Sequence, residues 1–187
     1  MKSATLYAIG VGPGDPGLIT LKAARILEEV GVVFAEASTR NDASQALDIA
    51  RPLLRPDAVV RRLDFPMTRD QAVLEEAWTR NAAAVAEAVE QGRSAAFLTL
   101  GDPMTYSTFG YLLRTLDRLG RRPPVEVVPG ITAYQAAAAK LALPLAESEE
   151  NLAVLSGVCA PQTLARQLDA ADNAVILKAY RNFAAIR

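Results

Sequence analysis

The stretch "TLYAIGVGPGDPGLITLKAARILEEV", residues 5–30, decides the fold of this chain. The apolar run from Thr5 to Gly12 predicts a buried strand, and the glycines and prolines after it predict a turn. Apolar residues at helical spacing in 21–30 predict a helix, with Thr20 as its N-cap. Because strand, turn and helix patterns then alternate along the chain, the sequence predicts a parallel α/β architecture.

The same alternation continues to the end of the chain, with a candidate domain boundary near Gly130. We predict further strands at residues 32–34, 58–65, 94–100, 125–130, 152–157 and 174–180. We predict further helices at residues 44–54, 69–91, 107–119, 131–143 and 163–168, and Gly92 as the C′ residue of the second of these. The first five strands predict a mostly parallel, five-stranded sheet flanked by helices.

Composition excludes several classes of chemistry. The 187 residues are 51% hydrophobic, which is enough for a substantial core, and the net charge is -1. Histidine is absent and Cys159 is the only cysteine, so disulfide frameworks, zinc sites and an imidazole general base are all excluded. We therefore predict no metal site and expect a reducing, cytoplasmic location. No apolar run approaches the roughly 20 residues of a spanning helix, so no membrane partner is expected.

The first turn contains Gly12-x-Gly14-x-x-Gly17, which has the form of a dinucleotide-binding fingerprint, and Glu36 lies downstream where a ribose ligand is expected. The context disfavours that interpretation, because Gly17 precedes the helix cap instead of lying in the first helical turn. Pro13 and another proline also remove main-chain donors that a pyrophosphate would use. A purely structural turn and a different ligand both stay open.

Three predicted strands end in glycine and proline turns that lead toward helices. These turns are residues 12–16, residues 101–103 and residues 129–132. Asp102 by itself is typical of an Asx-turn or a helix cap. Three such turns at the carboxyl ends of parallel strands nevertheless predict a pocket built largely of main-chain groups.

The segments "GVGPGDPGLITLKAARIL", "TLGDPMTYSTFGYLL" and "VEVVPGITAYQAAAAKLALPLAE" resemble, in order and spacing, the signatures of the tetrapyrrole (corrin and porphyrin) methyltransferases. Within that family, residues 60–70 and 99–109 are most similar to the members that methylate carbon 20 of precorrin-2 in cobalamin synthesis. The resemblance implies two α/β domains with a ligand cleft between them. The first would be residues 1–130, and residues 131–187 would begin a second domain with a mixed sheet.

The family uses S-adenosylmethionine, so the resemblance implies this methyl donor and S-adenosylhomocysteine as its product. The positions that match the cofactor-lining residues of the family are Pro13, Leu100, Gly101, Asp102, Thr105, Thr132, Ala133 and Lys178. A proton must leave the methylated carbon, and the candidate acceptors are Asp15, Asp102, Tyr106 and water. No catalytic residue is assigned.

The implied substrate is a small tetrapyrrole with several carboxylates, either metal-free or with cobalt. Arginines near predicted loops and strand ends are candidates to bind those carboxylates, although surface arginines usually only face solvent; they are Arg40, Arg61, Arg62, Arg69, Arg114 and Arg181. Family members usually form homodimers and extend beyond the equivalent of Arg187, so a homodimer and an incomplete second domain are expected. No nucleic-acid partner is expected, since the sequence pI is about 5.6.

Other functions within the resemblance stay open. One is methylation of another tetrapyrrole, of the uroporphyrinogen III or precorrin-4 type. A second is methylation of a macromolecule, and a third is a module that binds the cofactor without catalysis.

Overall fold

A computed structural model describes residues 4–37, 44–179 and 183 of the chain. By its internal contacts the chain divides into two compact units, Met1–Ala133 and Tyr134–Arg187. This division falls three residues beyond the boundary predicted at Gly130. Each unit is described separately below.

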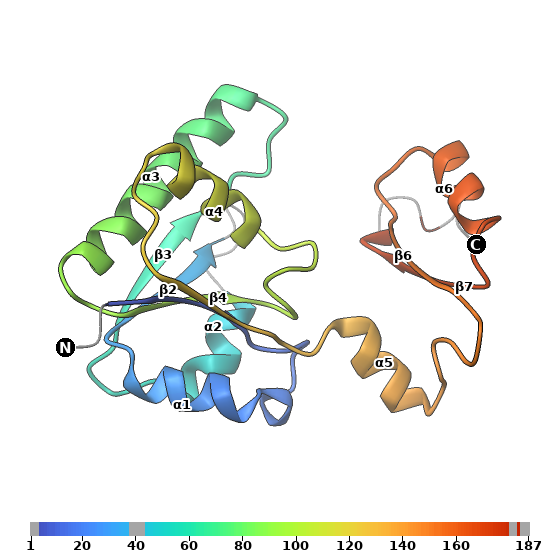
Figure 1. Cartoon of the computed structure of the whole chain (residues 1–187), viewed down its shortest axis with the longest axis horizontal. Coiled ribbons are helices and arrows are strands. Elements are labelled where there is room, and N and C mark those ends of the chain that lie inside the picture. Colours follow the sequence, from blue (N-terminus) through green and yellow to red (C-terminus); the bar gives the residue numbers. More distant parts are fainter. Residues whose placement is uncertain (1–3, 38–43, 180–182, 184–187) are drawn as a thin grey trace. The chain divides into compact units, whose positions relative to one another are not determined.

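The first unit is built on a five-stranded sheet in which all strand pairs are parallel (Figure 1). Its strands lie in the order β3-β2-β4-β1-β5. They are β1 (Leu6–Gly10), β2 (Val32–Ala37), β3 (Val59–Asp64), β4 (Ala95–Thr99) and β5 (Val125–Val128). The three central strands are almost wholly buried, as a parallel sheet covered on both faces requires. The predicted parallel, five-stranded sheet is confirmed.

Two layers of helices cover the sheet (Figure 1). One face packs against α1 (Leu21–Glu29) and α2 (Gln45–Ala50), which is followed by a short 3₁₀ helix, η2 (Arg51–Leu53). The other face packs against α3 (Gln71–Glu90) and α4 (Phe109–Arg118). Alternate residues of each strand enter opposite cores, with Phe34 and Phe97 on the α3–α4 face and Val33 and Leu98 on the α1–α2 face.

Side-chain caps fix several helix ends. Thr20 accepts a hydrogen bond from the Ala23 amide at 3.2 Å, which confirms it as the N-cap of α1. The helix predicted from residue 69 begins two residues later, because the carboxylate of Asp70 accepts from the amides at the start of α3. Gly92 follows Gln91, the C-cap of α3, and takes a φ of 79°, as predicted for a C′ residue.

Strand β2 is longer than predicted. It continues to Ala37, whereas the sequence predicted a strand of only residues 32–34. Glu36 therefore lies inside the sheet, paired in register with Leu63 of β3. The prediction ended the strand early because it relied on a run of apolar residues, and the polar Glu36 interrupts that run.

Helices α3 and α4 also meet through aromatic side chains. The Trp78 ring of α3 stacks on the Tyr111 ring of α4 with centroids 4.8 Å apart and an angle of 15° between the planes. The Arg114 guanidinium lies 5.0 Å from the centre of the same tyrosine ring, within cation–π range.

The second unit contains most of α5 (Ala133–Leu141), followed by β6 (Leu152–Ser156), α6 (Pro161–Leu168) and β7 (Asn173–Leu177). The two strands pair in parallel, so within residues 134–179 the predicted mixed sheet is represented by one parallel pair. Leu155 and Leu164 are its buried apolar side chains in this range.

Candidate functional site

The candidate site lies where the direction of the chain connections reverses, at the carboxyl ends of β1 and β4. From β1 the chain crosses to β2 through α1, whereas from β4 it crosses to β5 through α4, on the opposite face of the sheet. Open α/β sheets bind their ligands at such a switch point, because the loops diverge there and leave a crevice. All three predicted glycine and proline turns follow strands β1, β4 and β5, which are neighbours in the sheet.

The main chains of these three turns are in direct contact. Gly12 and Gly101 form an antiparallel bridge, with Gly101 N donating to Gly12 O at 2.8 Å and Gly12 N donating to Gly101 O at 3.3 Å. A Cβ atom on Gly130 would lie 2.0 Å from Gly101 O, and one on Gly10 would lie 2.5 Å from the same oxygen. Only glycine fits at Gly10 and Gly130, because backbone atoms occupy the place of a side chain.

Asp102 connects the second turn to the third. Its Oδ1 accepts from Met104 N at 2.8 Å and from Thr105 Oγ1 at 3.4 Å, and its Oδ2 accepts from Gly130 N at 3.1 Å. The Asx-turn alternative for Asp102 is therefore what the structure contains. The carboxylate holds two rim loops together, and three of its acceptor positions are already used.

The first turn is open to solvent beyond the bridge. Gly12 and Gly14 take φ angles of 81° and 147°, and the half-buried Pro13 lies between them. Asp15 Oδ1 accepts from Gly17 N at 2.8 Å and thereby caps a 3₁₀ turn, η1 (Pro16–Leu18). Gly17 thus lies outside α1, which agrees with the argument against a dinucleotide fingerprint.

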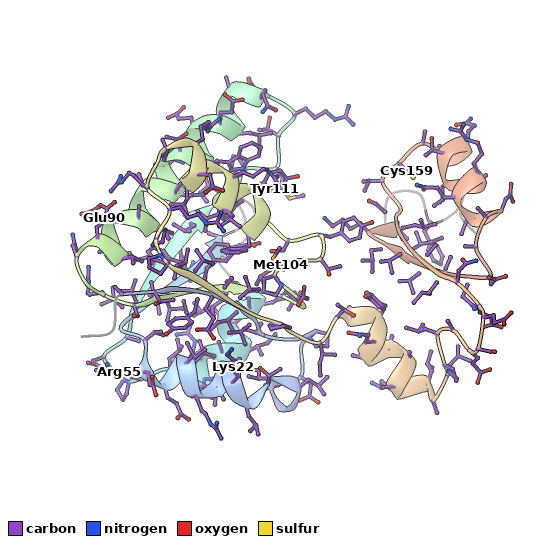
Figure 2. The ribbon with its side chains drawn as sticks, in the orientation of Figure 1. Lys22, Arg55, Glu90, Met104, Tyr111 and Cys159 are labelled. Atoms are coloured by element: carbon purple, nitrogen blue, oxygen red, sulfur yellow. The ribbon has the colours of Figure 1, made fainter. Side chains whose placement is uncertain are left out.

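Three large apolar side chains that flank or follow the second turn are exposed. They are Leu100, Met104 and Tyr106, and Met104 is labelled in Figure 2. Tyr106 has a φ of 51°, which is a left-handed conformation. For a residue other than glycine this conformation costs about 1 to 3 kcal/mol. A strained residue persists only where its surroundings fix it.

The remaining predicted cofactor residues fall in two places. Thr132 is buried beside the glycine contacts, where its Cα is 4.0 Å from the Cβ position of Gly101, and Ala133 begins α5. Lys178 belongs to the second unit and follows β7 directly, with an exposed side chain and a φ of 57°. The first unit alone therefore brings together all the predicted residues except Lys178.

Four of the six candidate arginines lie in the described part of the first unit, spread over several elements. Arg61 and Arg62 lie on β3, Arg69 lies in the loop after it, and Arg114 lies on α4. Arg40 and Arg181 lie outside the described residues. Two hollows in the first unit, one beside α3 and one at the amino ends of β1 and β5, also lie away from the glycine turns.

Sequence patterns missed a set of contacts made by hydroxyl groups at the start of α4. Ser107 Oγ lies 3.1 Å from Thr99 Oγ1 and accepts from Phe109 N at 3.1 Å. Thr108 Oγ1 donates to the Glu36 carboxylate at the end of β2. No local pattern signals that contact, because 72 residues separate its partners.

Two general properties of the described residues bear on the site. They contain no group of three metal-binding side chains, and their helices include none with the length and apolar character needed to cross a bilayer.

The chain matches the family Tetrapyrrole (Corrin/Porphyrin) Methylases over residues 5–187 and belongs to it. It is therefore a methyltransferase, and the resemblance noted from its three turns is confirmed.

More specific relatives are found within this family. The chain is 41% identical over 97% of its length to the cobalt-precorrin-2 C(20)-methyltransferase of Salmonella typhimurium, of which it covers 76%. It is 35% identical over 97% of its length to the precorrin-2 C(20)-methyltransferase of a Sinorhizobium species, again covering 76%. A solved structure, uroporphyrin-III C-methyltransferase from Thermus thermophilus complexed with S-adenosylhomocysteine, is 29% identical with a TM-score of 0.57. That alignment covers 84% of this chain and 57% of the other.

Proposed function

We propose that this chain transfers a methyl group from S-adenosylmethionine to carbon 20 of precorrin-2, or of its cobalt form, in cobalamin biosynthesis. The observation that carries the proposal is the identity of 41% and 35% with two C(20)-methyltransferases over nearly the whole chain. The convergence of the three glycine turns at the switch point supports the proposal, because open α/β sheets bind ligands at such a point.

The glycine turns fit a nucleoside that approaches the main chain closely. A Cβ atom on Gly101 would meet no heavy atom nearer than Thr132 Cα at 4.0 Å, and one on Gly14 would meet nothing within 4 Å. The backbone at both positions thus faces open space. Main-chain groups there can bind polar parts of the cofactor, and the exposed Leu100 offers apolar surface for its base.

When bound, S-adenosylmethionine supplies an electrophilic methyl group on a positively charged sulfur. In the reaction the sulfur–methyl bond breaks, a carbon–carbon bond forms at carbon 20, and a proton leaves that carbon. A reduced tetrapyrrole is electron-rich at its bridging carbons, so the protein has no need of a nucleophile of its own. Its task is alignment, which in well-oriented reactions lowers the barrier by roughly 7 to 11 kcal/mol.

Two of the candidate proton acceptors already accept hydrogen bonds within the loops. The carboxylates of Asp15 and Asp102 both hold loops, the first by a bond from Gly17 N and the second by three bonds. These hydrogen bonds give both carboxylates a structural role. We therefore propose that water takes the proton, because an unionised tyrosine hydroxyl such as that of Tyr106 is a poor proton acceptor.

The proposal also includes a cytoplasmic homodimer that binds no nucleic acid. The free thiol of Cys159 accords with a reducing compartment. Sedimentation at micromolar concentration tests the dimer, and a stable monomer would contradict it.

A methyl-transfer assay tests the proposed reaction. The chain is incubated with S-adenosylmethionine carrying a ¹³C methyl group and, separately, with precorrin-2, cobalt-precorrin-2 and uroporphyrinogen III. We expect a new ¹³C methyl signal at carbon 20 of one or both precorrin-2 forms. Transfer only to uroporphyrinogen III would point to another tetrapyrrole methyltransferase, and binding of S-adenosylhomocysteine without any transfer would point to a non-catalytic module.

A further inference from the structure

Glu36 lies at the carboxyl end of β2 and is half-buried. It occupies the same face of the strand as Phe34, two residues earlier, and that face packs against α3 and α4. Its carboxylate accepts the hydroxyl hydrogen of Thr108, the residue before α4. The strand thereby holds the start of a helix that follows a different strand, β4.

The Thr108 hydroxyl is not needed to begin the helix. Thr108 occupies the N-cap position, yet its side chain makes no capping hydrogen bond, and it is Ser107 that accepts from Phe109 N. The adjacent Ser107 hydroxyl also contacts Thr99 of β4. Two consecutive hydroxyls are thus held by two neighbouring strands, Ser107 by β4 and Thr108 by β2.

These contacts of Ser107 and Thr108 fix the C-terminal end of the loop formed by residues 101–108, and we call them the far anchor. The N-terminal end of the loop is fixed independently, by the bridge between Gly12 and Gly101 and by the hydrogen bond from Gly130 N to Asp102. We call these contacts the near anchor. Between the two anchors lie the exposed side chains of Met104, whose amide donates to Asp102, and of Tyr106. Because the two anchors share no residue, the far anchor can be weakened while the near anchor stays intact.

We propose that Glu36 is a positioning residue of the methyltransferase, which acts through Thr108 to hold Met104 and Tyr106 in the conformation that binds the tetrapyrrole. This inference rests on the proposed function. It assigns the macrocycle to Met104 and Tyr106, and the cofactor to the near anchor. Loss of the Glu36–Thr108 bond therefore affects binding of the macrocycle more than binding of the cofactor.

The test compares Thr108→Val, which removes the hydroxyl, with Thr108→Ser, which keeps it. We expect Thr108→Val to raise KM for precorrin-2 about tenfold, equivalent to roughly 1.4 kcal/mol, the scale of one hydrogen bond to a charged group. The Kd for S-adenosylhomocysteine should change less than about twofold, within ordinary context effects. Thr108→Ser should recover most of the KM.

Thr115→Val is the matched control for helix stability. Its hydroxyl donates to Tyr111 O at 2.8 Å within the same helix, away from the loop. Hydrogen–deuterium exchange of residues 103–107 should be faster in Thr108→Val than in wild type and in Thr115→Val. Three results for Thr108→Val would each overturn the proposal. They are exchange as slow as in wild type, a wild-type KM for precorrin-2, and an equal loss of affinity for precorrin-2 and S-adenosylhomocysteine. If exchange of residues 103–107 is faster only in Thr108→Val, but the wild type does not methylate precorrin-2, the proposed function alone is overturned.

Discussion

Gly130→Ala tests whether the three turns depend on direct contact between their main chains. The added Cβ would lie 2.0 Å from Gly101 O and 2.8 Å from both C and Cα of Gly10. All three neighbours are backbone atoms, which cannot rotate away, so the turns must separate. Overpacking of this kind costs about 1 to 3 kcal/mol, occasionally more, and we expect a loss of at least about 3 kcal/mol in the free energy of unfolding. A displaced rim should also weaken S-adenosylhomocysteine binding at least about tenfold.

Gly31→Ala is the control, because a Cβ at Gly31 would meet no heavy atom within 4 Å. This variant should match the wild type or gain about 0.4 to 1 kcal/mol through a stiffer unfolded chain. Urea denaturation followed by circular dichroism measures stability, and calorimetric titration measures ligand affinity. A Gly130→Ala protein with wild-type stability and affinity would refute the inference that the contact builds the site.

Three further predictions concern individual side chains. Asp102→Ala removes the acceptor of Gly130 N and should lower the unfolding free energy by about 1 to 3 kcal/mol in urea denaturation, and no loss would show that Asp102 does not hold the turns. Thr20→Ala removes the α1 cap and should cost about 1 kcal/mol by the same measurement, whereas Thr20→Ser should cost little. The hydrogen bond from Arg121 lowers the pKa of Glu90, so the stability gained from this pair should be present above the ordinary glutamate pKa and lost as pH falls through the lowered value. Carboxyl NMR titration should show that lowering in wild type and its reversal in Arg121→Ala.

Local pattern was sufficient to predict the elements that position the site. Buried apolar runs marked β1 and β4, and the glycine and proline turns after them indicated that the edge of the sheet carries function. The cap at Thr20 was also predictable, since capping needs only residues that are near in sequence. These features share one property, which is that their causes lie within a few residues.

Contacts across the sheet were not predictable in the same way. Gly10 looked like an ordinary strand residue, and its need to be glycine appears only when Gly101 and Gly130 lie against it. Glu36 was considered as a ribose ligand because of its distance along the chain, whereas the fold places it against Thr108. The order of strands in the sheet determines which residues become such partners. That order cannot be predicted from the hydrophobic periodicity of any one segment.

The stack of Trp78 on Tyr111 gives the protein a built-in optical reporter. Trp78 is the only tryptophan of the chain, so its fluorescence follows the packing of α3 on α4 and has no contribution from the residues after Ala133. Loss of that signal, timed against backbone ellipticity, would therefore reveal whether the first unit melts before, with or after the rest of the molecule.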